Sequence, residues 1–122
     1  EQLPSIRLRC VEKKLFVEVD AQRAIALARV NAESARACAK SEGAIPWTGV
    51  DGVQVDKLSV QELSELVKEL RSIDPRLTII GAGGINPGNA ADYAATGVDG
   101  LATTAPYTAK PIDMSVRMRM AE

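Results

Sequence analysis

The chain has 122 residues, of which 46% are hydrophobic and 25% are charged, and this length and composition are typical of one modest globular domain. Its 15 basic and 16 acidic residues nearly cancel and only 3% of residues are aromatic, so neither nucleic acid nor a membrane surface is an expected partner. The absence of histidine excludes Ser-His-Asp and Cys-His catalysis and histidine-bound zinc, and the lack of a membrane-length apolar run or a signal segment leads us to expect a cytoplasmic protein.

Four short segments rich in β-branched and aliphatic residues predict β-strands, at residues 15–19, 52–55, 77–80 and 100–103. After the first, Asp20 is a candidate N-cap for a helix over residues 21–29. Residues 31–48 then form an insertion relative to a normal βαβ crossover. Its first part is able to extend the helix, and residues 44–49 are typical of a turn.

Two further helices follow the second and third strands. Ser59 and Glu62 have the spacing of a capping box, and the helix that they open carries an amphipathic stripe of Leu63, Leu66, Val67 and Leu70. Asn86 and Pro87 predict the N-cap and first turn of the next helix, which ends near Gly97. A loop over residues 106–111 and a short helix over residues 113–120 complete the prediction.

The alternation of strand and helix predicts an α/β fold with a parallel sheet. The short repeats are typical of a (β/α) barrel, but a complete barrel needs about 200 to 250 residues. We therefore expect residues 1–122 to form a single partial domain, built from parallel βα repeats as the C-terminal half of a TIM-type barrel. An open half leaves sheet edges uncovered, so we expect a homo-oligomer or a partner half.

The glycine-rich segment IGAGGINPGN, residues 80–89, follows a predicted strand and precedes a helix. Gly83 and Gly84 allow the backbone to approach a ligand, and free N–H groups at such a turn attract anions. Asn86 stands where a Rossmann fingerprint needs its third glycine. The residues alone leave two interpretations open: a phosphate site, or a tight turn between strand and helix.

The next strand ends at Thr103, Thr104 and Ala105, one βα unit later. The loops after neighbouring late strands commonly form the phosphate site of such barrels, so these residues strengthen the phosphate interpretation.

Two carboxylates stand at or near the ends of the first two strands. Glu18 lies between Val17 and Val19 and so points to the opposite face of its strand, and Asp56 follows the second strand. Such carboxylates bind ribose hydroxyls or Mg²⁺, or they cap helices and pair with surface cations. Lys57 is either an ion-pair partner of Asp56 or a second phosphate contact.

The order of the motifs FVEVD, GVDGVQVDK and GAGGINPGNAADYAATGVDGLAT resembles the C-terminal barrel domain of the quinolinate (nicotinate-nucleotide) phosphoribosyltransferase family. The resemblance implies that Glu18 and Asp56 are catalytic and approach phosphoribosyl diphosphate and its Mg²⁺. It also implies that Gly83, Gly84 and residues 103–105 bind phosphate. The motifs VDKLS and TAPYTAKPID are similar to the ModD branch, which is linked to molybdenum transport and to nicotinate-nucleotide pyrophosphorylases.

Three departures from the family pattern limit this resemblance. Ile80 and Ala82 replace a polar pair near the substrate, and Thr104, Ala105 and Pro106 replace a glycine-containing turn. The family residues that bind the pyridine dicarboxylate lie upstream of the matched motifs, so we do not expect this chain alone to bind quinolinate productively. The sequence therefore predicts a phosphoribosyltransferase-like domain; the alternatives are a non-catalytic phosphate-binding module and an accessory protein linked to molybdate transport.

Overall fold

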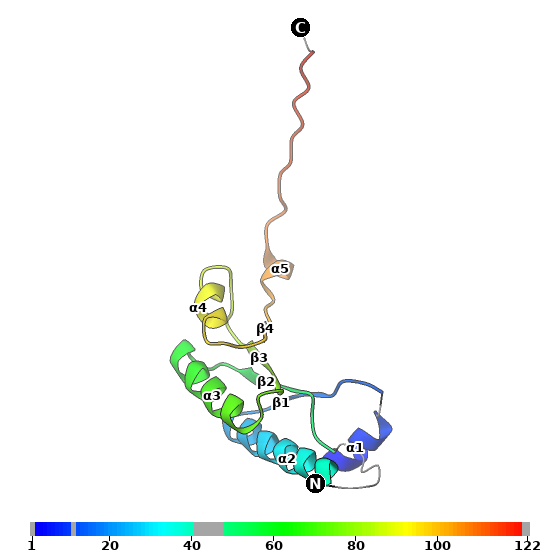
Figure 1. Ribbon diagram of the computed structural model, residues 1–122. Helices are drawn as coiled ribbons and strands as arrows, with labels where there is room; N and C mark the ends of the chain where they lie inside the picture. Colours follow the sequence, from blue (N-terminus) through cyan, green and yellow to red (C-terminus); the bar gives the residue numbers. More distant parts are fainter. Residues whose placement is uncertain (1, 11, 41–47, 121–122) are drawn as a thin grey trace.

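A computed structural model describes residues 2–10, 12–40 and 48–120 of the chain (Figure 1). In this part of the chain the order of elements is α1 (Leu3–Arg9), β1 (Phe16–Glu18), α2 (Ala21–Lys40), β2 (Gly52–Asp56), α3 (Val60–Ile73), β3 (Thr78–Ala82), α4 (Ala90–Ala94), β4 (Gly100–Leu101) and α5 (Ala105–Thr108). The four strands form one parallel sheet in the order β1-β2-β3-β4. This confirms the predicted α/β fold, the C-terminal half of a TIM-type barrel.

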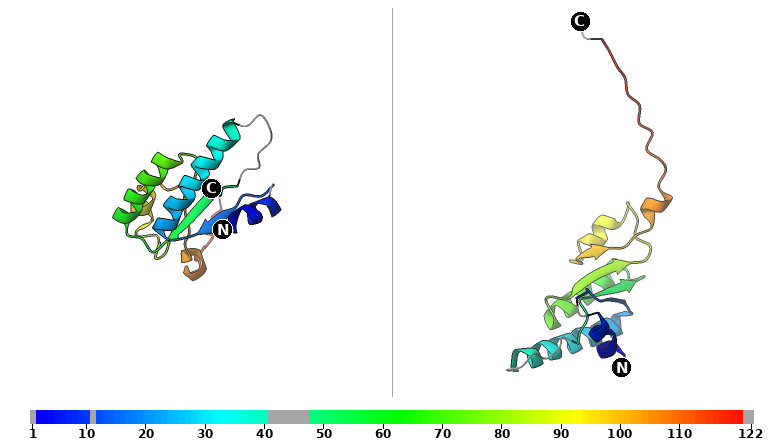
Figure 2. Two further views of the ribbon diagram at one scale, coloured as in Figure 1. Left: turned by 90° about the horizontal axis from the view of Figure 1, so that it is seen from below. Right: turned by 90° about the vertical axis from the view of Figure 1, so that its right-hand side faces the viewer.

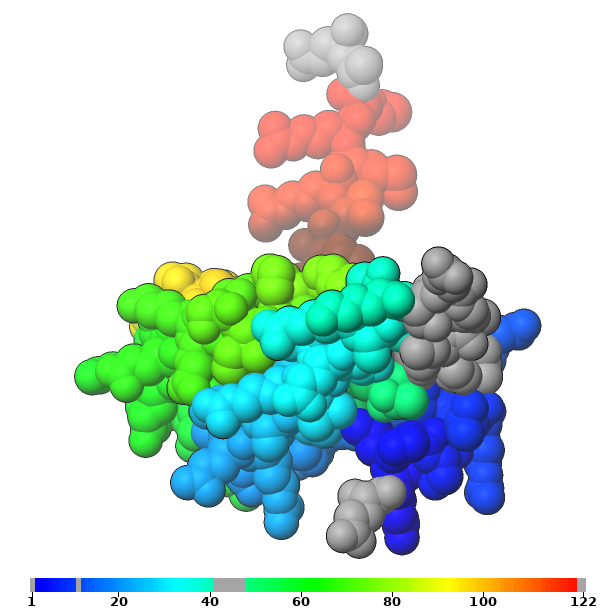
Figure 3. All heavy atoms as spheres, turned by 60° about the horizontal axis from the view of Figure 1, so that its bottom comes forward, coloured from blue at the N-terminus to red at the C-terminus, as the bar shows by residue number. Residues whose placement is uncertain are grey.

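Helices α2 and α3 lie side by side over one face of the sheet (Figures 2 and 3). The strands alternate, so every second side chain enters the core between the sheet and these helices. Val53, Val55 and Ile79 are at most 1% exposed there. Their helix partners are Ala24, Ala28, Leu63, Leu66, Val67 and Leu70. Burying this continuous apolar layer supplies most of the stabilisation of such a half-barrel.

The opposite face of the sheet has no helical layer among the described residues. Glu18 pairs in register with Gln54, and Gln54 pairs with Ile80. Their side chains alternate away from the core residues Val53 and Ile79. Glu18 is exposed on this open face, as its alternation with Val17 predicts.

Local capping signals fix where two helices begin. The side-chain Oγ of Ser59 accepts from the Glu62 N–H, and the Glu62 carboxylate accepts from the Ser59 N–H, so the predicted capping box of α3 is confirmed. The Asp20 carboxylate accepts from the N–H of Arg23 at 2.8 Å and caps α2 as expected. Helix α2 continues to Lys40, so residues 31–40 of the proposed insertion are helical, and residues 41–47 lie outside the described part of the chain.

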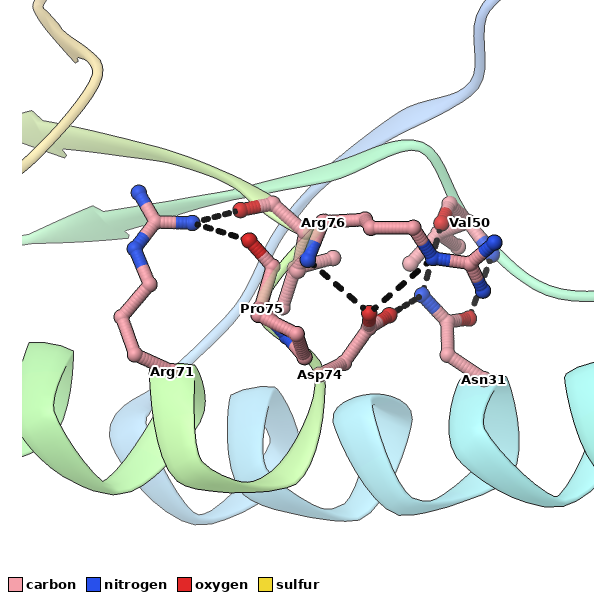
Figure 4. A network of polar contacts seen from close by, with 7 residues as sticks. Asn31, Val50, Arg71, Asp74, Pro75 and Arg76 are labelled. Atoms are coloured by element: carbon pink, nitrogen blue, oxygen red, sulfur yellow. Dashed lines mark hydrogen bonds and ion pairs between the residues drawn. The ribbon is translucent and has the colours of Figure 1, made fainter.

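A buried polar network joins α2, the end of α3 and the segment that leads into β2 (Figure 4). The Asn31 side chain, 2% exposed, donates to the Val50 C=O at 2.8 Å and to Asp74 at 3.0 Å, and it accepts from the Val50 N–H at 2.9 Å. Within the described residues every buried side-chain polar atom has a partner. A satisfied network of this kind fixes helix position rather than binding a ligand.

Several predicted boundaries are wrong. Helix α4 begins at Ala90 with Asn89 at its N-cap, because the Asn86 side chain instead accepts from the Gly88 N–H and stabilises a turn. That helix ends at Ala94, and Gly97 lies beyond it with a positive φ of 88°. Strand β3 extends two residues further than expected, to Ala82.

The two ends of the chain also differ from the prediction. Helix α1 was not anticipated, and its proline in the first turn and arginines in the last turn are the signals that favour it. The helix expected over residues 113–120 is absent: residues 109–120 form neither helix nor strand and extend away from the sheet (Figures 1 and 2). A short helix, α5, lies partly in the predicted loop. No helix in the described ranges is long and apolar enough to cross a membrane.

Candidate functional site

The carboxyl ends of β2, β3 and β4 surround a hollow of about 380 Å³. Parallel strands bring their carboxyl ends to one edge of a sheet, where the loops that follow them meet. The hollow is lined by Gln54, Asp56, Ala82, Gly83, Gly84, Ile85, Ala102, Thr103 and Thr104. Five of the residues predicted from the sequence are therefore together: Asp56, Gly83, Gly84, Thr103 and Thr104.

The glycine turn after β3 has the backbone conformation that the sequence suggests. Gly83 and Gly84 adopt positive φ values of 86° and 71°, which non-glycine residues rarely adopt. A side chain at Gly83 would collide with Asp56 Oδ1 and the Lys57 N, whereas Gly84 has open space beside it. Gly83 is thus needed for close packing, and Gly84 presents bare backbone to the hollow.

Two asparagine side chains stabilise this turn. The side-chain amides of Asn86 and Asn89 both donate to the Gly84 C=O, at 3.2 and 3.1 Å. No hydrogen bond leads from the N–H of Gly83 or Gly84 to any residue that the structure describes. The turn therefore offers donors without protein partners at the hollow, which is the arrangement that binds anions.

Thr103 connects the two loops of the site. Its hydroxyl donates to the Ile85 C=O at 2.5 Å and accepts from the Ala105 N–H at 3.1 Å. Ala105 lies next to the hollow but does not line it, and its N–H is engaged by Thr103. Thr103 thereby fixes the loop after β4 against the glycine turn after β3.

Asp56 and Glu18 differ in their position relative to the hollow. Asp56 lines the hollow, with its side chain 32% exposed, and its Oδ2 lies 3.5 Å from the Lys57 Nζ. Lys57 is therefore an ion-pair partner of Asp56, while its own side chain is 85% exposed. Its φ of 60° is unusual for a non-glycine residue, and strained backbone of this kind often accompanies functional sites.

Glu18 lies beside the hollow rather than in its lining. Its Oε2 is 3.5 Å from the Nε2 of Gln54, a lining residue on the neighbouring strand. Sequence reasoning missed Gln54, although it alternates with Val53 and Val55 in the way that drew attention to Glu18. It also missed the asparagines that hold Gly84, because Asn86 was interpreted as a helix cap.

The described residues contain no group of three or more His, Cys, Asp or Glu side chains arranged to hold a metal ion. A protein cage for a metal is therefore not present in this part of the chain. Mg²⁺ commonly takes only one or two carboxylates and completes its shell with water and substrate phosphate. Asp56 and Glu18, on the same sheet face at neighbouring strand ends, fit that weaker mode of binding.

Comparisons with known proteins show which family the chain belongs to. The family model described as quinolinate phosphoribosyl transferase, C-terminal domain, matches residues 6–117. A relative from Escherichia coli O127:H6, named "Putative pyrophosphorylase ModD", is 31% identical over 116 residues, which is 95% of this chain and 35% of that protein. A protein of the same name from Pasteurella multocida is 35% identical over 66 residues, 54% of this chain and 23% of that protein.

The chain thus spans about a third of the length of the E. coli relative. A solved structure of an uncharacterized B. cereus protein is similar with a TM-score of 0.46 and 16% sequence identity, over 72% of this chain and 23% of that chain. The family match covers nearly the whole chain, and the relatives that cover 95% of it carry the ModD name. The chain belongs to the quinolinate phosphoribosyltransferase C-terminal domain family, in its ModD branch.

Proposed function

We propose that this chain forms the phosphate-binding end of a phosphoribosyltransferase-like active site, which holds phosphoribosyl diphosphate or a related phosphorylated small molecule. The observation that carries the proposal is the pair of positive-φ glycines, Gly83 and Gly84, which line the hollow and whose N–H groups have no acceptor among the described residues. Phosphate oxygens are suitable partners for such donors.

The second loop of the hollow supports the same proposal. Thr104 lines the hollow next to Thr103, whose hydroxyl is already engaged by the glycine turn and the Ala105 N–H. We therefore assign phosphate contact to Thr104 and a positioning role to Thr103. Lys57, long and exposed, is able to leave Asp56 and reach a bound phosphate from the rim.

The acidic residues suit the ribose and an accompanying cation. Asp56, in the hollow, and Glu18, beside it, would hold Mg²⁺ together with substrate oxygens and water. The ion would neutralise charge on the leaving diphosphate. Glu18 and Asp56 would also stabilise positive charge that develops on the ribose.

The proposed phosphate-binding site is one end of an active site. The chain corresponds to about a third of the relatives' length, and the acceptor of the phosphoribosyl group is not assigned by any described residue. A homo-oligomer, expected because the half-barrel leaves its sheet edges uncovered, is also part of the proposal.

The test is isothermal titration of phosphoribosyl diphosphate with Mg²⁺ into the 122-residue chain. Saturable binding is expected, and Gly84→Val should abolish it because the side chain would occupy the space beside the turn. Gly97→Val is the matched control, since Gly97 also has a positive φ but lies away from the hollow. Absence of binding, or equal loss in both variants, would contradict a phosphate site at the glycine turn.

A binding module without turnover is the second candidate. The observation that favours it is that no lysine or arginine is among the residues that line the hollow, although Lys57 pairs with the lining residue Asp56. Transferases commonly stabilise a departing diphosphate with more than one positive group. If the chain binds phosphoribosyl diphosphate but releases no pyrophosphate in the presence of Mg²⁺, the binding module is supported. If pyrophosphate is released and Glu18→Gln abolishes that release, the transferase is supported.

A further inference from the structure

Tyr93 links the segment after β3 to the segment after β2, although it is not among the residues that line the hollow. Its ring is partly buried and packs against the core from α4, and its hydroxyl donates to the Leu58 C=O at 2.9 Å. Leu58 lies between β2 and α3, 35 residues earlier in the chain. The helix that follows the glycine turn is therefore tied to the loop that leaves the end of β2.

The residue before Leu58 has an unusual backbone conformation. Lys57 has a φ of 60°, and among the described residues it is the only non-glycine residue with a positive φ. An L-residue avoids this region because its Cβ comes too close to a carbonyl oxygen. Such a conformation persists only where the surrounding structure imposes it, so Lys57 needs contacts that hold it in place.

Two hydrogen bonds provide these contacts. The Lys57 N–H donates to the Ala82 C=O at 3.0 Å, and the Leu58 C=O accepts from Tyr93. The first bond fixes the peptide group that precedes Lys57, and the second fixes the peptide group that follows Leu58. The backbone of the two residues between these peptide groups is thereby restricted from both ends.

The peptide group between Leu58 and Ser59 is engaged through both of its polar atoms. Its C=O accepts from Tyr93, and its N–H donates to the Glu62 carboxylate at 2.8 Å in the capping box of α3. A peptide group held on both sides is a fixed point of the loop. Removal of the Tyr93 hydroxyl would leave only the contact with Glu62.

The conformation of Lys57 determines what lies at the hollow. Its Nζ is 3.5 Å from the Oδ2 of Asp56, which lines the hollow. The glycine turn packs directly against these two residues, because a side chain at Gly83 would collide with the Asp56 Oδ1 and the Lys57 N. A Lys57 backbone that relaxed to a negative φ would turn its side chain away from this position.

We propose that Tyr93 is a positioning residue for the phosphate site. Its hydroxyl holds the Leu58 C=O and thereby keeps Lys57 in the left-handed conformation that places its ammonium group beside Asp56. The consequence for ligand binding rests on the proposed function, whereas the effect on the Lys57 backbone does not.

Hydrogen exchange of the ligand-free chain, followed residue by residue by NMR, measures the effect on the backbone. Tyr93→Phe isolates the hydroxyl, because phenylalanine keeps the ring in the core. The Lys57 N–H should exchange roughly tenfold faster in this variant than in the wild type. Tyr107→Phe is the matched control: Tyr107 is 90% exposed and does not line the hollow, so its variant should exchange like the wild type.

The amide of Leu70, a buried residue of α3, separates a local effect from a global one. A loss of overall stability would accelerate exchange at Leu70 at least as much as at Lys57, whereas loosening of the loop accelerates Lys57 selectively. Unchanged exchange at Lys57 in Tyr93→Phe, or acceleration at Leu70 by the same factor or more, would overturn the proposal.

Isothermal titration of phosphoribosyl diphosphate with Mg²⁺ tests the consequence for the site. Tyr93→Phe should weaken binding roughly fivefold. Because the hydroxyl acts through Lys57, the same change should cost less than about twofold in a chain that already carries Lys57→Met. Full additivity of the two losses would overturn the role of Tyr93 in positioning Lys57. A wild type that does not bind would contradict the proposed function, and exchange at Lys57 would then still decide whether Tyr93 holds the loop.

Discussion

Arg71 and Asp99 meet at 2.6 Å and join α3 to the segment that leads into β4. The same Oδ2 of Asp99 accepts from the Ile79 N–H at 2.7 Å, and Arg71 donates to the Leu77 C=O at 2.6 Å. Figure 4 shows the Arg71 guanidinium donating to carbonyl groups of the segment that leads into β3. One ion pair thus holds three elements at the amino end of the sheet.

We expect Asp99→Asn to lower the free energy of unfolding by about 1 kcal/mol, a small value because both side chains are partly exposed. The amide loses the ionic part of the contact and cannot accept equally from both donors. Urea denaturation of the variant and the wild type measures the difference. Glu69→Gln, on the exposed face of α3, is the control and should change the midpoint little.

The same pair predicts a dependence on pH. Burial would raise the pKa of Asp99, but hydrogen bonds from Arg71 and the Ile79 N–H, together with the Arg71 charge, lower it below its ordinary 3.8. A carboxyl group with a lowered pKa in the fold stabilises it above the ordinary value and loses that contribution as the pH falls through the folded value. The stability difference between wild type and Asp99→Asn should therefore shrink as the solution is acidified below about pH 4. A difference that is constant with pH would show that the charge of Asp99 does not contribute.

The Asn31 network should be the most sensitive polar site in the described chain. Asn31→Ala would remove the Asn31 partner from Asp74 Oδ2 and from both backbone groups of Val50 in a buried setting, while Asp74 Oδ1 keeps its contacts with Arg76. We expect a loss of about 2–4 kcal/mol in the free energy of unfolding. Glu33→Ala, two residues further along α2 and exposed, should cost less than about 0.5 kcal/mol. Chemical denaturation compares the two variants, and equal midpoints would contradict a supporting role for the network.

The two glycines of the phosphate turn should respond differently to alanine. Both have a positive φ, and alanine in that conformation costs about 1–2 kcal/mol. Gly83→Ala adds a collision with Asp56 and the Lys57 backbone, whereas Gly84→Ala meets no atom within 4 Å. Thermal and urea denaturation should therefore rank Gly83→Ala as clearly less stable than Gly84→Ala. Equal losses would mean that the contact between the turn and Asp56 is loose.

The sheet and its helices could be predicted because their signals are local. The capping box of Ser59 and Glu62 lies within one helical turn, and the core strands alternate visibly around Val53 and Ile79. The grouping of Asp56 with Gly83 could also be predicted, since parallel strands bring their carboxyl ends to one edge.

The features that were missed depend on partners distant in sequence. Nothing near Asn31 indicates that its partners are Val50 and Asp74, and Asn86 resembles a helix cap until its contact with the Gly84 C=O is known. Residues 112–120 are different, because their own sequence argues against the helix that we predicted there. Met and Arg favour helices, but apolar residues at every second position have the period of a strand, and a helix over residues 113–120 would have placed them all round its surface.

The acidic side of the hollow leads to the last prediction, which depends on the proposed function. Asp56 lines the hollow in which we propose that the diphosphate lies, Glu18 lies beside that hollow, and Lys57 pairs with Asp56. Bare diphosphate would be repelled by these carboxylates, whereas its Mg²⁺ complex would be attracted. Removing Mg²⁺ with a chelator should therefore weaken binding of phosphoribosyl diphosphate to the wild type by roughly tenfold or more.

Asp56→Asn distinguishes a role in holding the ion from simple repulsion. If Asp56 binds the cation, this variant should bind the Mg²⁺ complex more weakly than the wild type, and chelation should change its affinity much less. Asp92→Asn, exposed on α4 and not part of the hollow, should keep the full Mg²⁺ dependence. Titration of the wild type and both variants, each with and without the ion, measures the six affinities that decide the matter. An Asp56→Asn chain that binds the Mg²⁺ complex as tightly as the wild type would limit Asp56 to its contacts with Lys57 and the glycine turn, and would leave Glu18 as the carboxylate to test next.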